Sequence, residues 1–432
     1  MINRILKKLF KKQAFLLIIT LLTIRGFEFL TRAYIANKLG PEVNGQIQLF
    51  DTYINLIILF AIFGMNTSVL KFVSESNIRS TQKVIFNKII SLTLIFSFGI
   101  SITLYLLSYV IPYDKWLIGS LRLMLLVIPL FSLTYFSQGI IVHYLLAREL
   151  VNFSSIYKLI LGSFFSLFLL IGALSYGFKG YYLSYFIYGA ISSLIIIIFL
   201  IKKEEIKLNE VYNFIKKPKS LFREKYFSFA IPSFASNATS LIISNLDVLV
   251  ISYVLRDTVS VGIFSAAVLV SRGVLIIPMG YMQAQFAKIN KQLINDRNHI
   301  FKIYYKQFKK MSVLMLPISL VIIISSEFII KYAFGLEYMD ASLILKLLII
   351  STLIQSIGMI GGNILLALGN VKANLILNLL RGIIGLFLLL YFTNILGLKG
   401  SAIANILGAL LFLISQIIFL VYIQKINNRK IV

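Results

Sequence analysis

The sequence predicts an all-α protein that crosses a membrane many times. Of its 432 residues, 59% are hydrophobic and 13% are charged, whereas soluble globular chains are about 45–50% apolar and about 25% charged. Apolar runs of about 20 residues, the length that a helix needs to cross a bilayer, recur along the whole chain. The alternating apolar and polar residues expected of a membrane β-barrel do not occur.

Twelve helical spans can be placed along the chain, and the charges between them predict the orientation. The predicted spans are 14–39, 46–70, 88–111, 121–146, 152–175, 181–201, 227–255, 259–285, 311–334, 342–368, 373–395 and 400–424. Both chain ends and the even-numbered connections hold most of the lysines and arginines, whereas each odd-numbered connection carries one or two. Because positively charged loops stay inside, we expect a multi-pass protein of the cytoplasmic (inner or plasma) membrane with both termini in the cytoplasm.

The net charge of +26 follows mostly from this topology, so no nucleic-acid partner is predicted. The basic segment 202–225 is expected to be a cytoplasmic linker that touches anionic membrane lipids. The chain has no cysteine and two histidines, so neither a disulfide nor a histidine-rich metal site is predicted.

An internal repeat divides the chain into two similar halves. A shift of 220 residues places LLARELV (145–151) on LLALGNV (365–371) and GFKG (177–180) on GLKG (397–400). With a slightly smaller shift, LGPEVNGQI (39–47) resembles LRDTVSVGI (255–263). We therefore predict a bundle of six helices at 1–201, a basic linker at 202–225 and a second bundle of six helices at 226–432. Because six is even, both bundles have the same orientation, which makes a parallel repeat.

Three charged residues lie on one face of the first predicted span. At 100° per residue, Arg25 and Arg32 lie about 20° apart around the helix, and Glu28 lies about 60° from Arg25. An unpaired charge at the centre of a span costs about 2.5–3.5 kcal/mol, so this face is expected to look into a polar interior. In the second half, Asp247, Arg272 and Arg381 lie inside other predicted spans.

The excess of arginine among these intramembrane charges predicts a cationic interior. Arginine binds phosphate and carboxylate groups through two parallel hydrogen bonds, so a cationic interior favours an anionic substrate. A single arginine paired with an acid can instead lock the packing of two helices, and this alternative stays open for each residue alone. The nucleotide-binding motifs G-x-x-x-x-G-K-[ST] and G-x-G-x-x-G do not occur. We predict no catalytic residue and expect a transporter, not an enzyme.

Three segments resemble polysaccharide exporters of the multidrug/oligosaccharidyl-lipid/polysaccharide (MOP) superfamily. They are residues 36–75 with the turn LGPEVNG, residues 226–267 with NLDVLVI, and residues 367–405. The resemblance implies two six-helix bundles in a V-shaped fold similar to that of multidrug and toxin extrusion (MATE) transporters. It also implies the flipping of undecaprenyl-pyrophosphate-linked oligosaccharides, such as O-antigen or capsule repeat units, by alternating access for cell-surface polysaccharide biosynthesis.

The resemblance also implies roles for the charged residues. The expected ligands of the pyrophosphate or of acidic sugars are Arg25, Arg32, Arg272 and Arg381. Glu28 and Asp247 are expected to be charge partners, or to couple transport to a sodium or proton gradient. No other cofactor is expected. The expected partners are a lipid-linked anionic glycan, membrane lipids and the proteins that polymerise or assemble the polysaccharide.

Two relatives within the superfamily are alternatives. Peptidoglycan-precursor (lipid II) flippases usually have fourteen spans, whereas twelve are predicted here. MATE transporters have twelve spans but export cations, and resemblance to them implies acid-rich cavities. The excess of arginine argues against a MATE-type drug exporter.

Overall fold

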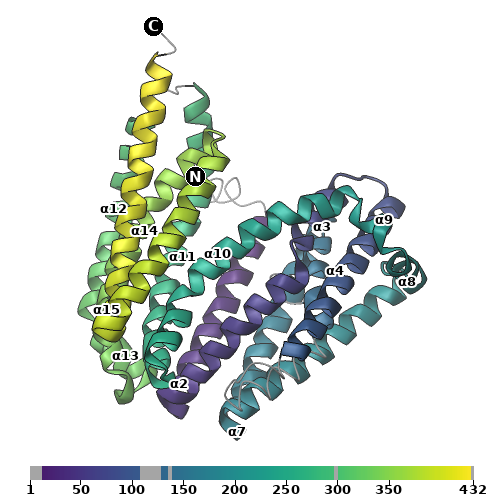
Figure 1. The fold of residues 1–432 in the computed structure, drawn as a ribbon, viewed down its shortest axis with the longest axis horizontal. Coiled ribbons are helices and arrows are strands. Elements are labelled where there is room, and N and C mark those ends of the chain that lie inside the picture. Colours follow the sequence, from purple (N-terminus) through teal and green to yellow (C-terminus); the bar gives the residue numbers. More distant parts are fainter. Residues whose placement is uncertain (1–11, 108–127, 135–138, 296–299, 430–432) are drawn as a thin grey trace. The chain divides into compact units, whose positions relative to one another are not determined.

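The computed structural model describes residues 12–107, 128–134, 139–295 and 300–429 (Figure 1). The elements in these ranges are helices, and no strand occurs among them. The labelled helices are α2 (Lys12–Ile62), α3 (Met65–Ser74), α4 (Arg79–Leu107), α6 (Ile140–Ala147), α7 (Val151–Lys202), α8 (Leu208–Lys216), α9 (Pro218–Phe222), α10 (Lys225–Leu255), α11 (Thr258–Asn295), α12 (Ile300–Ile324), α13 (Ser326–Phe334), the 3-10 helix η2 (Leu336–Tyr338), α14 (Asp340–Ala367) and α15 (Val371–Arg429).

The all-α membrane fold is confirmed in the part of the chain that the structure describes. Eight of its helices are long and apolar enough to cross a membrane. Parts of the predicted spans 88–111 and 121–146 lie outside the described residues. The count of twelve spans and the cytoplasmic location of the termini therefore remain predictions.

The three longest helices each turn sharply inside. The turns of α7 and α15 each lie between two predicted spans, and that of α2 lies between the span 14–39 and the span 46–70, of which α2 contains the first part. The turns lie at Gly40 of α2 (φ 78°, ψ 174°), Gly177 of α7 (φ 59°, ψ −142°) and Gly397 of α15 (φ 60°, ψ −138°). A positive φ strains residues with a side chain, so glycine is the natural residue at each turn. The two arms of α7 are also joined by a hydrogen bond from the Tyr188 hydroxyl to the Leu161 carbonyl (3.0 Å).

The turns of α7 and α15 have the same geometry, as the repeat of 220 residues predicts. Gly180 and Gly400 occupy equivalent positions three residues after the two turns. A Cβ atom added to Gly180 would lie 1.9 Å from the Gly172 carbonyl oxygen, and one added to Gly400 would lie 1.8 Å from that of Phe392. Because residues 172 and 392 also differ by 220, the sequence repeat is a repeat of backbone structure at this place.

A second pair of equivalent turns differs in the residue at the left-handed position, which gives a stability prediction. Leu145–Leu150 and Leu365–Asn370 each close with a hydrogen bond of 2.9 Å between their end residues. The left-handed position is Glu149 (φ 59°) in the first turn and Gly369 (φ 78°) in the second. Left-handed backbone costs a residue with a side chain about 1–2 kcal/mol. We expect Glu149→Gly to raise the free energy of unfolding by about 1 kcal/mol, measured by unfolding in detergent.

The reverse change at the equivalent position is the matched control. A Cβ atom added to Gly369 would have no neighbour within 4 Å, so Gly369→Ala tests the backbone conformation without a steric clash. We expect it to destabilise the protein by a similar amount. A Glu149→Gly variant less stable than the wild type would show that the glutamate side chain contributes more than its strained backbone costs.

The chain divides into two compact units, which are described separately below. Unit 1 comprises Met1–Ile35 and Phe50–Ile242, and unit 2 comprises Ala36–Leu49 and Ile243–Val432. The helices α2 and α10 contribute to both units. The predicted bundle limits at 201 and 226 remain predictions.

In unit 1, the linker predicted at 202–225 contains helices and packs on the helices before it. Helix α3 packs against α4 and α6, and α4 packs against α8 and α9. The Phe86 and Tyr144 rings stack with centroids 3.7 Å apart and planes within 7°. The segment predicted as a basic connection is therefore part of the packed structure of unit 1.

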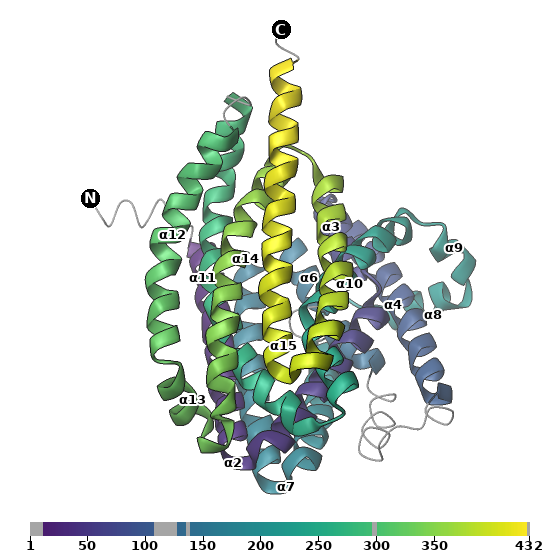
Figure 2. The ribbon, with the colours of Figure 1, turned by 60° about the vertical axis from the view of Figure 1, so that its left-hand side comes forward.

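In unit 2, α14 lies at the centre and packs against α11, α12 and α15 (Figure 2). The short segment 36–49 of α2 joins this unit by packing against the start of α11. A Cβ atom added to Gly45 would lie 1.9 Å from the Thr258 carbonyl oxygen, and one added to Gly262 would lie 1.8 Å from that of Pro41. The Asn44 side-chain amide also donates to the Gly262 carbonyl (3.0 Å).

This reciprocal contact joins the two repeat-related motifs found in the sequence. Pro41 and Thr258 differ by 217 residues, as do Gly45 and Gly262, so each motif contributes its glycine to the same kind of contact. Small residues let helices approach closely inside a membrane. The glycines at 45 and 262 are therefore required by the packing of these two backbones.

Candidate functional site

Two groups of charged residues lie inside the predicted spans, one in each unit. The first group, called the Arg32 cluster here, comprises Arg25, Glu28, Arg32, Asp51 and Tyr181. The Arg32 guanidinium lies 3.2 Å from an Asp51 carboxylate oxygen, and these side chains are 15% and 24% exposed. The Tyr181 hydroxyl lies 3.1 Å from both Asp51 oxygens, to which it donates. The Arg32 guanidinium carbon also lies 5.8 Å from the centre of the Tyr181 ring.

The turn at Gly40 brings Arg32 and Asp51 together. Arg32 lies on the arm of α2 before the turn, Asp51 lies on the arm after it, and Tyr181 begins the second arm of α7. Asp51 was missing from the predicted site residues. It lies inside the predicted span 46–70, so the rule that selected the other intramembrane charges would have found it.

The other two charges of the first span form a more exposed pair. The Arg25 guanidinium lies 2.7 Å from the Glu28 carboxylate, and these side chains are 64% and 40% exposed. Glu28 therefore lies beside Arg25 as an ion-pair partner, and its predicted role in the site remains a prediction. Glu28 also interacts electrostatically with Asp51, so the charged face of the first span continues into the Arg32–Asp51 pair.

The second group, called the Asp247 cluster here, comprises Asp247, Arg272, Arg381 and Asn405 of unit 2. Asp247 accepts a hydrogen bond from the Asn405 side-chain amide (3.1 Å) and interacts electrostatically with both arginines. The exposed Arg272 guanidinium donates to the Ser244 carbonyl. The half-buried Arg381 guanidinium carbon lies 4.9 Å from the centre of the Phe412 ring.

The two clusters differ in charge balance. In the Arg32 cluster, two arginines face two acids, because Asp51 supplies the acid that the sequence analysis missed. In the Asp247 cluster, two arginines face one aspartate. Arginines therefore outnumber acids in the Asp247 cluster, whereas the Arg32 cluster is balanced; the predicted cationic interior remains a prediction.

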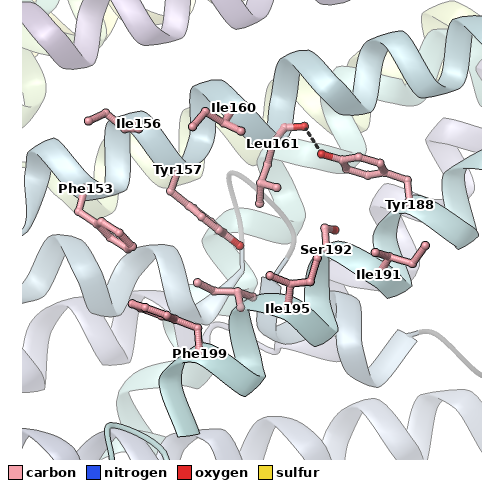
Figure 3. Close-up of a pocket in the computed structure, with 11 residues that line it drawn as sticks. Phe153, Ile156, Tyr157, Ile160, Leu161, Tyr188, Ile191, Ser192, Ile195 and Phe199 are labelled. Atoms are coloured by element: carbon pink, nitrogen blue, oxygen red, sulfur yellow. Dashed lines mark hydrogen bonds between the residues drawn. The ribbon is translucent and has the colours of Figure 1, made fainter. Parts of the chain in front are cut away.

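A groove between the two arms of α7 is apolar and contains none of the predicted site residues (Figure 3). Its volume is about 370 Å³, and its lining includes Phe153, Ile160, Ile191 and Phe199. A groove without a charged lining suits hydrocarbon and not a diphosphate. Among the described residues, no group of three or more His, Asp or Glu residues is placed to hold a metal ion.

A third charged group lies after α7, outside the predicted spans, and was also missed. Glu205 is 5% exposed and accepts hydrogen bonds from Arg79 (2.8 Å), Arg148 (2.8 Å) and the Tyr144 hydroxyl (2.5 Å). Burial by itself would raise the pKa of Glu205, but these bonds outweigh burial and lower the pKa below its ordinary value of 4.5. The group ties together three segments of unit 1 and is structural.

The lowered pKa of Glu205 predicts how its contribution depends on pH. A group whose pKa is lower in the folded state stabilises the protein above its unfolded-state pKa and loses that effect as the pH falls through the folded-state pKa. We expect Glu205→Gln to lower the unfolding temperature at pH 7, with the difference from the wild type shrinking as the pH falls below about 4.5. A difference that is independent of pH between 7 and 3 would contradict the ionised bonding described here.

The comparison with family models shows to which family the chain belongs. Residues 10–286 match the model of a family described as polysaccharide biosynthesis protein. The chain belongs to this family. The match covers residues 10–201 of the first predicted bundle, the linker and the start of the second bundle. It includes the residues of the Arg32 cluster together with Asp247 and Arg272. A comparison with curated proteins finds no match.

Solved structures of membrane transporters share the fold of the chain. The lipid II flippase MurJ in an inward closed conformation is similar with a TM-score of 0.72 and 16% identity, over 94% of this chain and 87% of that one. A multidrug resistance MATE family transporter of the MOP superfamily in an inward-facing conformation has a TM-score of 0.64 and 16% identity, over 93% and 96% of the two chains. A MOP superfamily transporter from Pyrococcus furiosus, described by the reverse polarity of its binding pocket, has a TM-score of 0.58 and 16% identity, over 96% of each chain.

Together these comparisons place the chain in the polysaccharide biosynthesis protein family and show that it shares the fold of solved transporters of the MOP superfamily. The predicted family resemblance and the all-α membrane fold are thus confirmed. At 16% identity, similarity to a solved structure establishes the fold and leaves the substrate open.

Proposed function

We propose that the protein flips undecaprenyl-pyrophosphate-linked oligosaccharide repeat units, such as those of O-antigen or capsule, across the cytoplasmic membrane by alternating access. The single observation that carries this proposal is that two arginines, Arg272 and Arg381, lie near one carboxylate, that of Asp247. Membership of a polysaccharide biosynthesis family supports a glycan as the cargo. A diphosphate is the anionic part that every such lipid-linked glycan carries.

In this proposal, Arg272 and Arg381 bind the diphosphate. A guanidinium group presents two parallel N–H donors that match two phosphate oxygens. Before the substrate binds, Asp247 reduces the repulsion between the two arginines, and the Ser244 carbonyl and the Phe412 ring hold them in place. The diphosphate then accepts hydrogen bonds from both guanidinium groups without a large rearrangement of the side chains.

The residues of the Arg32 cluster have two different roles in this proposal. Arg25 is the most exposed of its cations and adds a contact to the phosphate or to an acidic sugar. Arg32 is bound to Asp51 and Tyr181, so it holds the first span in position and contributes less to binding. Glu28 and Asp247 remain the proposed sites at which a sodium or proton gradient is coupled to transport.

The experiment that tests the proposal is deletion of the gene, followed by identification of the lipid-linked glycan that accumulates on the cytoplasmic side. We expect an undecaprenyl-diphosphate oligosaccharide to accumulate, and wild-type protein to restore its export. Proteins that polymerise or assemble the polysaccharide are proposed as partners. In the deletion strain, the repeat units that these proteins use should remain unpolymerised. If no lipid-linked glycan accumulates, the proposal is wrong.

A lipid II flippase is the second candidate, because the fold similarity to MurJ has a TM-score of 0.72. Lipid II also carries a diphosphate, so the Asp247 cluster suits both substrates. The accumulated lipid distinguishes the two functions, since lipid II contains the peptidoglycan disaccharide and a peptide. A MATE-type exporter of cationic drugs is disfavoured, because the excess positive charge of the Asp247 cluster would repel its substrate.

A further inference from the structure

The linker helix α8 is fixed on unit 1 through one face. The Asn87 side-chain amide donates to Glu210 (2.8 Å), and the Ser91 hydroxyl donates to the Val211 carbonyl (3.2 Å). Val211 is 5% exposed. Because Asn87 and Ser91 lie one turn apart on α4, they hold α8 in a defined position beside that helix (Figure 1).

The acids of the linker are mostly neutralised, whereas three exposed lysines at its end are in none of these ion pairs. Glu205 pairs with Arg79 and Arg148, which lie outside the linker, and Glu224 forms an ion pair with Lys88 of α4. Glu210 lies 3.3 Å from Lys207 within the linker. Three of the four acids between residues 203 and 224 are thus paired. The exposed lysines that follow along the chain are Lys216, Lys217 and Lys219.

A second face of α8 exposes large apolar side chains next to these lysines. Leu208 is 59% exposed and Tyr212 is 58% exposed. Residues four apart lie on the same side of a helix, so the two side chains form one stripe, which Lys216 extends by another turn. The core of unit 1 does not cover this stripe: the buried Val211 lies about 60° from Leu208 and about 100° from Tyr212 around the helix.

We propose that the stripe Leu208–Tyr212 and the lysines beside it lie in the headgroup layer of an anionic leaflet and bind acidic phospholipid. The depth of α8 relative to the membrane follows from the chain, because α8 lies between the end of the candidate span α7 at Lys202 and the start of the candidate span α10 at Lys225. An amphipathic helix with lysines beside its apolar stripe binds anionic bilayers through both features. This site holds unit 1 at a defined depth in the membrane, and it is independent of the proposed transport substrate.

The absence of cysteine gives a direct test with single labels. The full-length Tyr212→Cys variant is labelled with the environment-sensitive dye NBD and reconstituted into vesicles of phosphatidylglycerol and phosphatidylcholine. We expect blue-shifted emission, quenching by spin-labelled lipid and protection from aqueous iodide. The matched control is Asn213→Cys, because Asn213 is also exposed but lies 100° further around the helix. Its label should be quenched by iodide and not by spin-labelled lipid.

A second comparison tests the role of charge. In vesicles of phosphatidylcholine alone, and after Lys216, Lys217 and Lys219 are all changed to glutamine, the label at residue 212 should become several-fold more accessible to iodide. Because all labelled and changed residues are exposed, unfolding temperatures should stay close to that of the wild type. Equal iodide quenching at 212 and 213 in anionic vesicles would overturn the proposal. Protection of residue 212 that requires an added soluble protein would also overturn it and would indicate a protein partner.

Discussion

Arg32→Ala is expected to destabilise the protein by about 3 kcal/mol and to abolish most transport. Removal of one partner of a buried ion pair costs about 3–5 kcal/mol, because the remaining charge is left without compensation. The lower end applies here, since Asp51 is 24% exposed and keeps the hydrogen bond from Tyr181. The free energy of unfolding in detergent and the export of glycan in cells that lack the native protein measure the two effects.

The double variant Arg32→Gln/Asp51→Asn distinguishes the energy of the ion pair from the effects of changing each residue alone. Both charges are then absent, so we expect most of the lost stability to return, with a coupling energy of about 1–3 kcal/mol between the two sites. If the single changes simply add in the double variant, Arg32 and Asp51 do not act as a pair.

Gly45→Ala is the second change with a large expected effect. The added Cβ atom would lie 1.9 Å from the Thr258 carbonyl oxygen, so the backbones of α2 and α11 must move apart. Overpacking of this kind costs about 1–3 kcal/mol and sometimes more, and the lost Asn44–Gly262 hydrogen bond adds to it. We expect a lower unfolding temperature and a loss of glycan export.

Gly99→Ala is the matched control within a helix. A Cβ atom added to Gly99 would have no neighbour within 4 Å. Alanine is favoured over glycine in a helix interior by about 0.5–1 kcal/mol, so this variant should be slightly more stable than the wild type. If Gly45→Ala is as stable as Gly99→Ala, the close contact between the two motifs is not required.

Much of the fold could be predicted from residue patterns because membrane helices obey strict rules. The length and polarity of the apolar runs predicted helices, and the match of GFKG with GLKG indicated an internal repeat whose two copies turn at Gly177 and Gly397. The sequence did not predict the helical structure of the linker. Its many lysines indicated a solvated connection. Instead, the buried Val211 packs on unit 1, and the acids of the linker pair with basic residues of the helices before it.

The composition of the site was predicted less completely than the fold. Arg25 and Glu28 lie three residues apart on one helix, so their pairing follows from helix geometry alone. Asp51 and Arg32 meet only because the chain reverses at Gly40, and Glu205 is buried only because three distant donors converge on it. Contacts of this kind depend on tertiary structure and cannot be read from the spacing of residues.

The central claim is that arginines of unit 2 bind the diphosphate of a lipid-linked substrate. The most direct measurement is the affinity of the purified protein for undecaprenyl diphosphate and for undecaprenyl monophosphate, in the wild type and in Arg272→Gln/Arg381→Gln. A hydrogen bond to a charged group contributes about 1.5–3 kcal/mol, so we expect a preference of about tenfold or more for the diphosphate in the wild type, and none in the double variant. Equal binding of the two lipids by the wild type, or an unchanged preference in a folded double variant, would contradict the account.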